Sequence, residues 1–183
     1  MRNFLPFLIL IFLMSLMAFA MHKLSQQQNS ASENADEFGV HFVKTKIALP
    51  DFSLPDLFDE KKTFSSKDLN EKKYSIINFF ASWCTTCRAE HEILLRLQSE
   101  KIIDIYGVAW RDIAENTKSY LAQSGNPFKK VALDSGGLFS KISDINAIPE
   151  TWIVDQNGIV VMRFRGNLQE FSIDEIKEFL SKN

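Results

Sequence analysis

The sequence has few of the residues on which several common classes of protein depend. Its 183 residues include two Cys, three His, seven Gly and five Pro. Two cysteines cannot form a disulfide scaffold, a four-cysteine zinc site or an iron–sulfur site. So little Gly and Pro excludes a collagen-like or low-complexity chain. With 21 Lys and Arg against 23 Asp and Glu, the chain also lacks the basic excess typical of nucleic-acid binding.

Charged residues are also missing from the first part of the chain. Residues 3–22 contain no Asp, Glu, Lys or Arg and are apolar on every side of the helix they would form. Twenty helical residues reach about 30 Å, the thickness of the bilayer's hydrocarbon core. We therefore expect residues 1–22 to be a single-pass anchor in the cytoplasmic membrane, with the rest of the chain on the periplasmic side. A cleaved signal peptide is the alternative, because Ala18-Phe19-Ala20 fits the cleavage pattern.

Composition divides the rest of the chain into a tether and one domain. Residues 25–37 (SQQQNSASENADE) have almost no apolar side chains and cannot bury enough surface to fold. We predict that residues 23–41 form a flexible tether and that residues 42–183 form a single domain.

Two apolar runs predict the centre of a sheet. Residues 74–81 and 102–110 are rich in β-branched and aromatic side chains, which is typical of strands covered on both faces. Apolar positions at helical spacing predict a helix over residues 85–100. A strand–helix–strand unit of this kind has parallel strands.

The second half of the domain continues the alternation of strands and helices. Asp112 with Glu115 resembles a capping box, predicting a helix that ends at Gly125. Asn157-Gly158 predicts a hairpin whose two antiparallel strands lie at the edge of the sheet. Ser172 with Glu175 predicts the start of a final helix. The remaining predicted elements are a short strand at 130–133, a short helix within 137–143, and the hairpin strands at 151–154 and 159–164.

The two cysteines lie where the first predicted strand ends and a helix begins, in Cys84-Thr85-Thr86-Cys87. The first turn of a helix has unpaired N–H groups and a partial positive charge, and both favour a thiolate. Two intervening residues place the sulfurs within disulfide reach. We assign Cys84 as the attacking thiolate and Cys87 as the resolving thiol. The alternatives are two inert core thiols or a static disulfide, which would stabilise the chain only weakly because its loop is so small.

A metal site is a second alternative, because Cys84, Cys87 and His91 form a C-x2-C-x3-H pattern. Cu(I) accepts two thiolates, whereas zinc would need a fourth ligand. His22 and His41 lie in the predicted tether or at its edge. A Cu(I) metallochaperone therefore stays open as a different class of function. The simpler interpretation of His91 is a histidine satisfied by other protein groups, and we predict no cofactor.

The segments FFASWCTTCRAE, GVAWRD and NAIPETWIVDQNGIV together resemble the membrane-anchored, thioredoxin-like CcmG/DsbE family of cytochrome c biogenesis. The resemblance runs from about Leu49 (LPDFSLPDL) to the final predicted helix. It implies an α/β, thioredoxin-like fold with a mixed central sheet flanked by helices, preceded by an N-terminal transmembrane helix. It also implies a cis bond between Ile148 and Pro149, although local sequence alone favours the ordinary trans form.

The resemblance implies four substrate-binding residues. Pro149 would face the cysteine pair, and the backbone of Ile148 would pair with an extended substrate peptide. Glu150 would act on the electrostatics of the substrate or the thiols. Trp83 would shield the site and line the groove, unless it is simply a packed aromatic residue.

Glu90 is implied as a third catalytic residue beside Cys84 and Cys87. It shares a helix face with Cys87, so it would tune a thiol pKa or accept a proton; a solvated helix carboxylate is the alternative. The chain departs from the family at Thr85, where proline is usual, and this change should shift the reduction potential. Asn78 stands where general thioredoxins have a buried Asp, which leaves more of the proton transfer to Glu90.

The function that the resemblance implies is a periplasmic thiol:disulfide oxidoreductase. It would reduce the disulfide of the haem-attachment cysteines of apocytochrome c, and a membrane thiol transporter of the DsbD/CcdA type would re-reduce it. We expect a membrane-anchored monomer with no nucleic-acid partner. The alternatives are a general TlpA-like reductase of exported proteins, the Cu(I) metallochaperone, and a binding module with an inactive cysteine pair.

Overall fold

The computed structural model describes residues 12–21, 23 and 41–183. The chain divides into two compact units, Met1–Ala35 and Asp36–Asn183. In the first unit, residues 12–21 are helical and their side chains are exposed. Within the described part of the chain, no helix is long and apolar enough to cross a membrane. The remainder of the predicted anchor, and nearly all of the predicted tether, lie outside the described residues.

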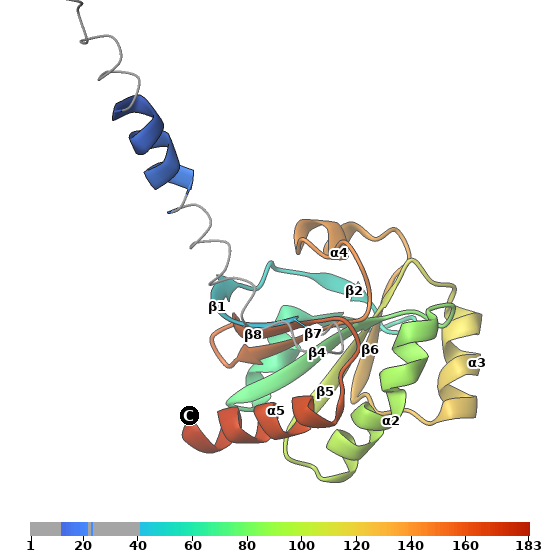
Figure 1. The fold of residues 1–183 in the computed structure, drawn as a ribbon. Coiled ribbons are helices and arrows are strands. Elements are labelled where there is room, and N and C mark those ends of the chain that lie inside the picture. The colour runs from blue at the N-terminus through green and yellow to red at the C-terminus, as the bar shows by residue number, and fades with distance from the viewer. Residues whose placement is uncertain (1–11, 22, 24–40) are drawn as a thin grey trace, which may run out of the picture. The chain divides into compact units, whose positions relative to one another are not determined.

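The second unit is built on a six-stranded mixed sheet with the strand order β1-β8-β7-β4-β5-β6 (Figure 1). β4, β5 and β6 are parallel, while β7, β8 and β1 follow on the other side of β4, each antiparallel to its neighbour. The bounds are β1 His41–Ala48, β4 Tyr74–Phe80, β5 Asp104–Trp110, β6 Lys130–Asp134, β7 Glu150–Asp155 and β8 Ile159–Arg165. The predicted α/β fold with a mixed sheet is confirmed.

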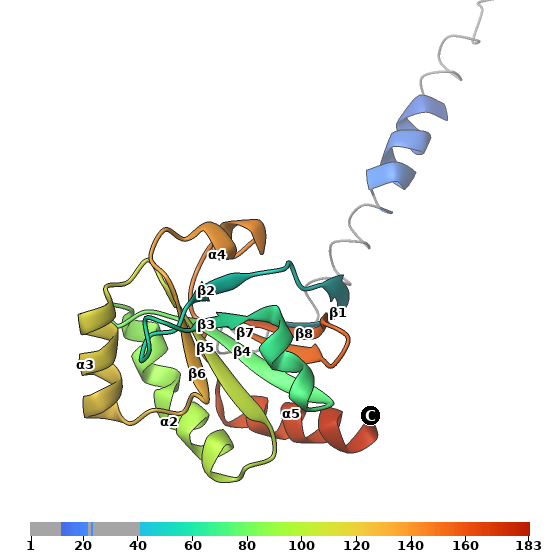
Figure 2. The same cartoon turned by 180° about the vertical axis from the view of Figure 1, so that it is seen from behind.

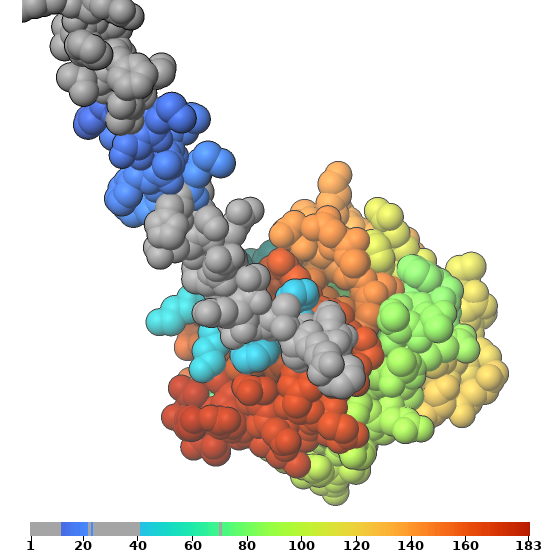
Figure 3. Space-filling view, viewed as in Figure 1, coloured from blue at the N-terminus to red at the C-terminus, as the bar shows by residue number. Residues whose placement is uncertain are grey.

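Helices and a small hairpin cover the two faces of this sheet (Figures 1 and 2). Side chains of α2, α3 and α5 join the core on one face, and those of α4, η1 and the β2–β3 hairpin join the core on the other. In the space-filling view, α2 and α3 lie directly against one another (Figure 3). The bounds are β2 Ser53–Pro55, β3 Thr63–Ser65, η1 Ser66–Glu71, α2 Thr85–Ser99, α3 Ala114–Ser124, α4 Leu138–Ile142 and α5 Glu170–Lys182.

The central position of β4 explains its apolar sequence. Six of its seven residues are buried, because the strand has a neighbour on each side and a core on each face. On one face, Ile76 lies in the same core as Leu97 of α2. On the other face, the ring of Phe79 lies 4.9 Å from that of Trp152 on β7. Burial on both faces holds the carboxyl end of β4, and the loop that follows it, on a rigid base.

The predicted edge position of the hairpin is wrong. β7 pairs with the central strand β4, and β8 is covered by β1, so neither hairpin strand lies at an edge. Most side chains of β1 are exposed, and this edge strand therefore lacks the alternation of apolar and polar residues that predicts a strand. The stacking of Phe42 on Phe164, with ring centres 5.8 Å apart, is one of the contacts that attach β1 to the domain.

The predicted starts of two helices are also wrong. α3 begins at Ala114 rather than at a capping box formed by Asp112, and its N-cap residue Ile113 makes no side-chain cap. It does end at Gly125, whose φ of 91° suits glycine. α5 begins earlier than predicted: Gln169 is its N-cap residue, and Ser172 is the third helical residue of the capping box.

Candidate active site

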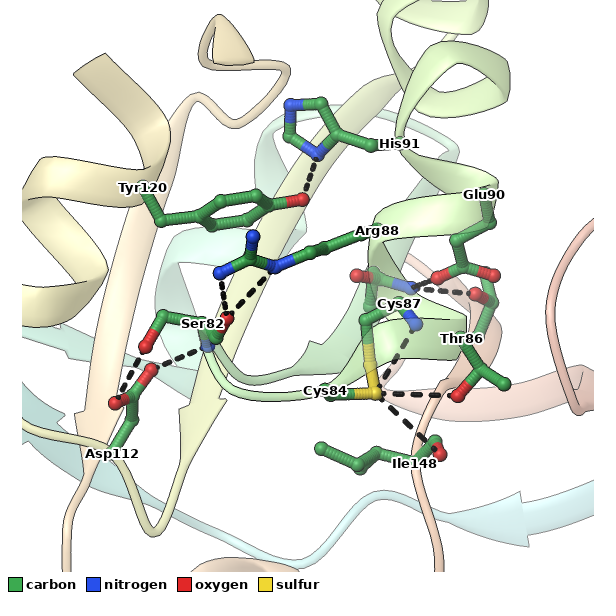
Figure 4. The surroundings of a disulfide bond; sticks show 12 residues. Ser82, Cys84, Thr86, Cys87, Arg88, Glu90, His91, Asp112, Tyr120 and Ile148 are labelled. Atoms are coloured by element: carbon green, nitrogen blue, oxygen red, sulfur yellow. Dashed lines mark hydrogen bonds between the residues drawn. A yellow bond between two sulfur atoms is a disulfide. The ribbon is translucent and has the colours of Figure 1, made fainter. Parts of the chain in front are cut away.

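The two cysteines form a disulfide at the N-terminus of α2, with their Cα atoms 5.3 Å apart. Cys84 is the N-cap residue, and its Sγ accepts a hydrogen bond of 3.1 Å from the N–H of Cys87 (Figure 4). Cys84 is 5% exposed and Cys87 is 2% exposed. The helix therefore offers one of its unpaired N–H groups to the sulfur of Cys84, as the position in the sequence predicts.

Pro149 lies beside this disulfide. The Ile148–Pro149 bond is cis, as the resemblance implies. Because β7 runs antiparallel to β4, the start of β7 lies at the same edge of the sheet as the end of β4, where Cys84 follows. The carbonyl oxygen of Ile148 is 3.9 Å from Cys84 Sγ. The disulfide sulfur carries no hydrogen, so this is a contact that only a reduced Cys84 thiol would turn into a hydrogen bond.

A surface groove of about 280 Å³ extends from Pro149 along the end of β8. Asn146, Ile148, Pro149, Arg165 and Gly166 are among the residues that line it. The groove therefore begins at the backbone that contacts Cys84 Sγ and has room for the side chain of a bound peptide.

Trp83 lies at the surface next to the cysteine pair. It is 56% exposed, its indole N–H donates to the carbonyl oxygen of Arg111 at 3.3 Å, and its ring centre is 6.2 Å from that of Trp110. Trp83 thus packs against Trp110 on one side, and more than half of its surface faces solvent. A large apolar surface faces solvent at the mouth of the site.

Glu90 is completely buried, which rules out the solvated carboxylate. One carboxyl oxygen accepts from the amide nitrogen of Asn78 and the other from the N–H of Leu168, each at 2.7 Å. Burial raises the pKa of Glu90 to about 8, and these two hydrogen bonds oppose the rise only in part. The amide of Asn78 also donates to Thr151 at 2.9 Å, which links α2 to the strand after Pro149. A buried acid that holds its proton at neutral pH thus lies one helical turn beyond Cys87.

Glu150 is bound by groups other than the cysteines. Its carboxylate accepts from the indole N–H of Trp152 and from Nε of Arg163, both at 2.7 Å, and it is 3% exposed in the protein. Side chains alternate along β7, so Glu150 and Trp152 lie on the face opposite to that of Thr151. Glu150 lines the groove, but the structure directs its charge to Arg163 rather than to Cys84.

His91 is satisfied by two protein groups, as its simpler interpretation predicts. Its Nε2 lies 3.0 Å from the carbonyl oxygen of Gly125, and its Nδ1 lies 2.8 Å from the hydroxyl of Tyr120. A neutral ring can donate to the carbonyl and accept from the hydroxyl, so neither nitrogen is directed at a shared ion with the cysteines. Among the residues that the structure describes, no cluster of three His, Cys, Asp or Glu side chains is arranged to hold a metal.

Sequence reasoning missed a set of contacts that holds the loop before Cys84. The carboxylate of Asp112 accepts from the N–H and the hydroxyl of Ser82, at 2.6 and 3.0 Å, and from the hydroxyl of Thr117 at 2.9 Å. The guanidinium of Arg88 donates twice to the carbonyl oxygen of Ser82, at 3.1 and 2.7 Å. One signal could have indicated this arrangement: Ser82 and Asp112 follow adjacent parallel strands, whose ends meet at one edge of the sheet.

Known proteins with sequences similar to this chain include thiol:disulfide interchange proteins, as expected for a cysteine pair in this geometry. Residues 44–180 match the Redoxin family. The thiol:disulfide interchange protein HelX of Rhodobacter capsulatus is 36% identical over 107 residues, which cover 58% of this chain and 60% of HelX. The thiol:disulfide interchange protein DsbE of Haemophilus influenzae is 33% identical over 122 residues, covering 67% of this chain and 66% of that protein. Each match thus spans less than two thirds of the relative's length.

Solved structures show the same fold. The thio-disulfide isomerase of Thermus thermophilus is 25% identical, with a TM-score of 0.60, and the alignment covers 75% of this chain and 97% of the isomerase. A secreted thiol-disulfide isomerase of Corynebacterium glutamicum gives a TM-score of 0.65 at 18% identity, over 78% of this chain and 92% of the other. The fold around the cysteine pair is therefore thioredoxin-like.

Proposed function

The chain belongs to the Redoxin family and is similar to thiol:disulfide interchange proteins of the DsbE type, and from that premise we propose that it is a dithiol reductant of exported proteins. The observation that carries this proposal is the Cys84–Cys87 pair at the N-terminus of α2, with the cis bond before Pro149 beside it. A disulfide with a purely structural role does not require a groove beside it or a buried carboxylic acid one helical turn beyond the second cysteine.

In the first step, the Cys84 thiolate attacks one sulfur of a substrate disulfide. A bond forms between Cys84 and that sulfur, and the substrate disulfide breaks, so the second substrate sulfur leaves as a thiolate. The N–H of Cys87 and the dipole of α2 favour the thiolate form of Cys84. The substrate peptide pairs with the backbone beside Ile148, in the manner of an added strand, and one of its side chains occupies the adjoining groove.

In the second step, Cys87 loses its proton and attacks Cys84 Sγ. The mixed disulfide breaks, the substrate sulfur that was bonded to Cys84 leaves as a thiolate, and the Cys84–Cys87 disulfide remains. Two electrons have passed from the pair to the substrate. Glu90 lies one turn from Cys87 and, in its ionised form, accepts the proton of that thiol; its pKa of about 8 is matched to this exchange.

We propose that the substrate is the oxidised haem-attachment pair of apocytochrome c and that a membrane thiol transporter of the DsbD/CcdA type reduces the protein again. Support comes from the resemblance of the cysteine, IPET and LPDFSLPDL segments to proteins of cytochrome c maturation. The uncharged residues 3–22 support a membrane anchor with the domain on the periplasmic side. Such an anchor raises the effective concentration of the domain near both partners.

Trapping of the mixed disulfide tests the chemistry. The full chain is reduced, mixed with a peptide that has an oxidised C-x-x-C-H segment, and analysed on non-reducing gels. We expect Cys87→Ser to accumulate a covalent complex, because the resolving thiol is gone, and Cys84→Ser to form none. Equal trapping by the two variants would contradict the assignment of attacking and resolving cysteines, and no reduction by the parent protein would refute the function.

The identity of the substrate is tested in cells. Deletion of the protein should lower the amount of haem-linked c-type cytochrome, and supply of a small exogenous thiol should restore it. Normal cytochrome levels after deletion would contradict this substrate and would favour a general reductase of other exported proteins.

A further inference from the structure

A side-chain hydroxyl contacts the sulfur of Cys84. Thr86, in the first turn of α2, places its Oγ1 3.4 Å from Cys84 Sγ (Figure 4). A disulfide sulfur has no hydrogen to give, so the hydroxyl of Thr86 is the donor in this hydrogen bond. The N–H of Cys87 donates to the same sulfur at 3.1 Å. Two donors from one helical turn therefore converge on the atom that would attack a substrate.

We propose that Thr86 is a catalytic residue whose hydroxyl donates a hydrogen bond to the Cys84 thiolate and so maintains the attacking form. This inference rests on the proposed function, because it concerns the same cysteine pair. A hydrogen bond to the charged form of a group favours that form, and bonds to a charged partner are stronger than bonds to a neutral one. The contact should therefore strengthen when the disulfide is reduced and Cys84 ionises.

A backbone carbonyl group on the other side of Cys84 disfavours the thiolate, so the hydrogen bond from Thr86 is needed to offset it. The carbonyl oxygen of Ile148, 3.9 Å from Cys84 Sγ, can accept a hydrogen bond from a thiol but repels a thiolate. The hydroxyl of Thr86 and the N–H of Cys87 both donate to the sulfur and therefore stabilise the thiolate. The ionisation of Cys84 thus depends on the balance between two donors on α2 and one acceptor before Pro149.

Charged groups near the pair are held by other partners. On α2, Arg88 donates to the carbonyl oxygen of Ser82 and the buried Glu90 accepts from Asn78 and Leu168. After β5, the carboxylate of Asp112 also binds Ser82.

On the third side, Glu150 at the start of β7 is paired with Arg163 of β8. Within the described part of the chain, none of these groups forms a hydrogen bond with Cys84 Sγ, which leaves Thr86 as the side chain that donates to it there.

The proposal moves no proton through Thr86. Reduction of the disulfide takes up two electrons and two protons and gives two thiols; Cys84 then releases its proton to solvent and becomes the thiolate. Thr86 keeps its own hydrogen throughout. Because it stabilises a form that exists only after reduction, Thr86 also favours the reduced state of the pair over the disulfide.

The chain provides its own control in Thr85. Thr85 precedes Thr86 in the same helical turn, both are exposed, and both are threonines. Among the residues that the structure describes, the Thr85 hydroxyl has no hydrogen-bond partner, whereas that of Thr86 is bonded to Cys84. Replacement of either residue by valine keeps the shape and removes the hydroxyl.

The experiment measures the rate at which iodoacetamide alkylates Cys84 as a function of pH. The reduced full chain is used, with the site of alkylation assigned by mass spectrometry of peptides, for the parent protein and the variants Thr86→Val, Thr86→Ser and Thr85→Val. We expect Thr86→Val to move the midpoint of the profile to higher pH and to slow alkylation at pH 6 about fivefold to tenfold. Thr86→Ser keeps the hydroxyl and should follow the parent protein, as should Thr85→Val.

A second readout is the equilibrium of the Cys84–Cys87 pair with glutathione. In Thr86→Val this equilibrium should move towards the disulfide, with Thr85→Val unchanged. The proposal is overturned if Thr86→Val matches Thr85→Val in both measurements, or if Thr86→Ser behaves like Thr86→Val. Neither readout uses a protein substrate, so a chain that reduces no substrate would refute the proposed function while leaving the result for Thr86 intact.

Discussion

At the scale of single residues, Glu90, one helical turn beyond Cys87, is a carboxylic acid that the protein buries completely. Unlike a surface carboxylate, it has lost its water and has only the amide of Asn78 and the N–H of Leu168 in return. Two neutral donors do not compensate for the hydration of a full charge, so the proton stays on the acid up to a pKa of about 8.

Glu90 should make the stability of the fold depend on pH. Its pKa rises from 4.5 to about 8 on burial, so the folded state binds the proton more tightly than the unfolded state. The resulting stabilisation is complete below pH 4.5 and is lost as the pH rises through 8. We expect the free energy of unfolding of the oxidised protein to fall between pH 5 and pH 8 by up to about 4 kcal/mol more than that of Glu90→Gln.

Urea denaturation at a series of pH values measures this difference. The amide of the Glu90→Gln variant does not titrate in this range, so its curve provides the baseline for all other groups. Parallel pH dependences in the parent protein and the variant would show that Glu90 is already ionised in the folded state.

Among the elements, α2 connects the active site to the core. Its N-terminus holds the cysteines, and its apolar side packs on the sheet. Leu97, near the far end, is completely buried, whereas Leu95 is only partly buried and packs beside Gly125. Two leucines of the same helix thus differ in burial.

Leu97→Ala should destabilise the protein far more than Leu95→Ala. Removal of a buried leucine side chain leaves a cavity and costs roughly 3–5 kcal/mol, whereas a partly exposed leucine should cost about 1 kcal/mol. Chemical denaturation of the two oxidised variants measures the difference. Similar losses for both would mean that α2 does not pack on the sheet through Leu97.

For the molecule as a whole, the described active-site residues lie within the second compact unit. From Asn78 to Leu168 they belong to one sheet and its flanking elements.

A chain shortened to residues 41–183 should reduce a peptide disulfide at the rate of the full chain. On the proposed function, it should not restore cytochrome c maturation in a deletion strain at native expression, because the effective concentration that a membrane anchor in residues 1–22 would give is lost. Peptide reduction followed by fluorescence and haem staining of cell extracts provide the two measurements. Slow peptide reduction by the shortened chain would show that residues 1–40 belong to the catalytic unit.

The sequence by itself determined the central elements and the reactive pair. β4 and α2 are long and strongly patterned, because burial on both faces demands a continuous apolar run and one-sided burial demands helical spacing. The position of Cys84 at their junction follows from that pattern. The cis bond before Pro149 came only from the resemblance, since nothing in the local sequence distinguishes it from a trans bond.

Tertiary structure decided which polar groups meet. That Asp112 binds Ser82 instead of closing a capping box, that Glu90 is buried against Leu168, and that Glu150 is neutralised by Arg163 all depend on residues distant in the chain. The position of β1, whose side chains are mostly exposed, is set by its backbone pairing with β8. The local pattern of apolar and polar residues predicts which side of each segment is buried. It does not predict which of several polar groups will form a hydrogen bond, because those groups come within about 3 Å of one another only when the strands and helices pack together.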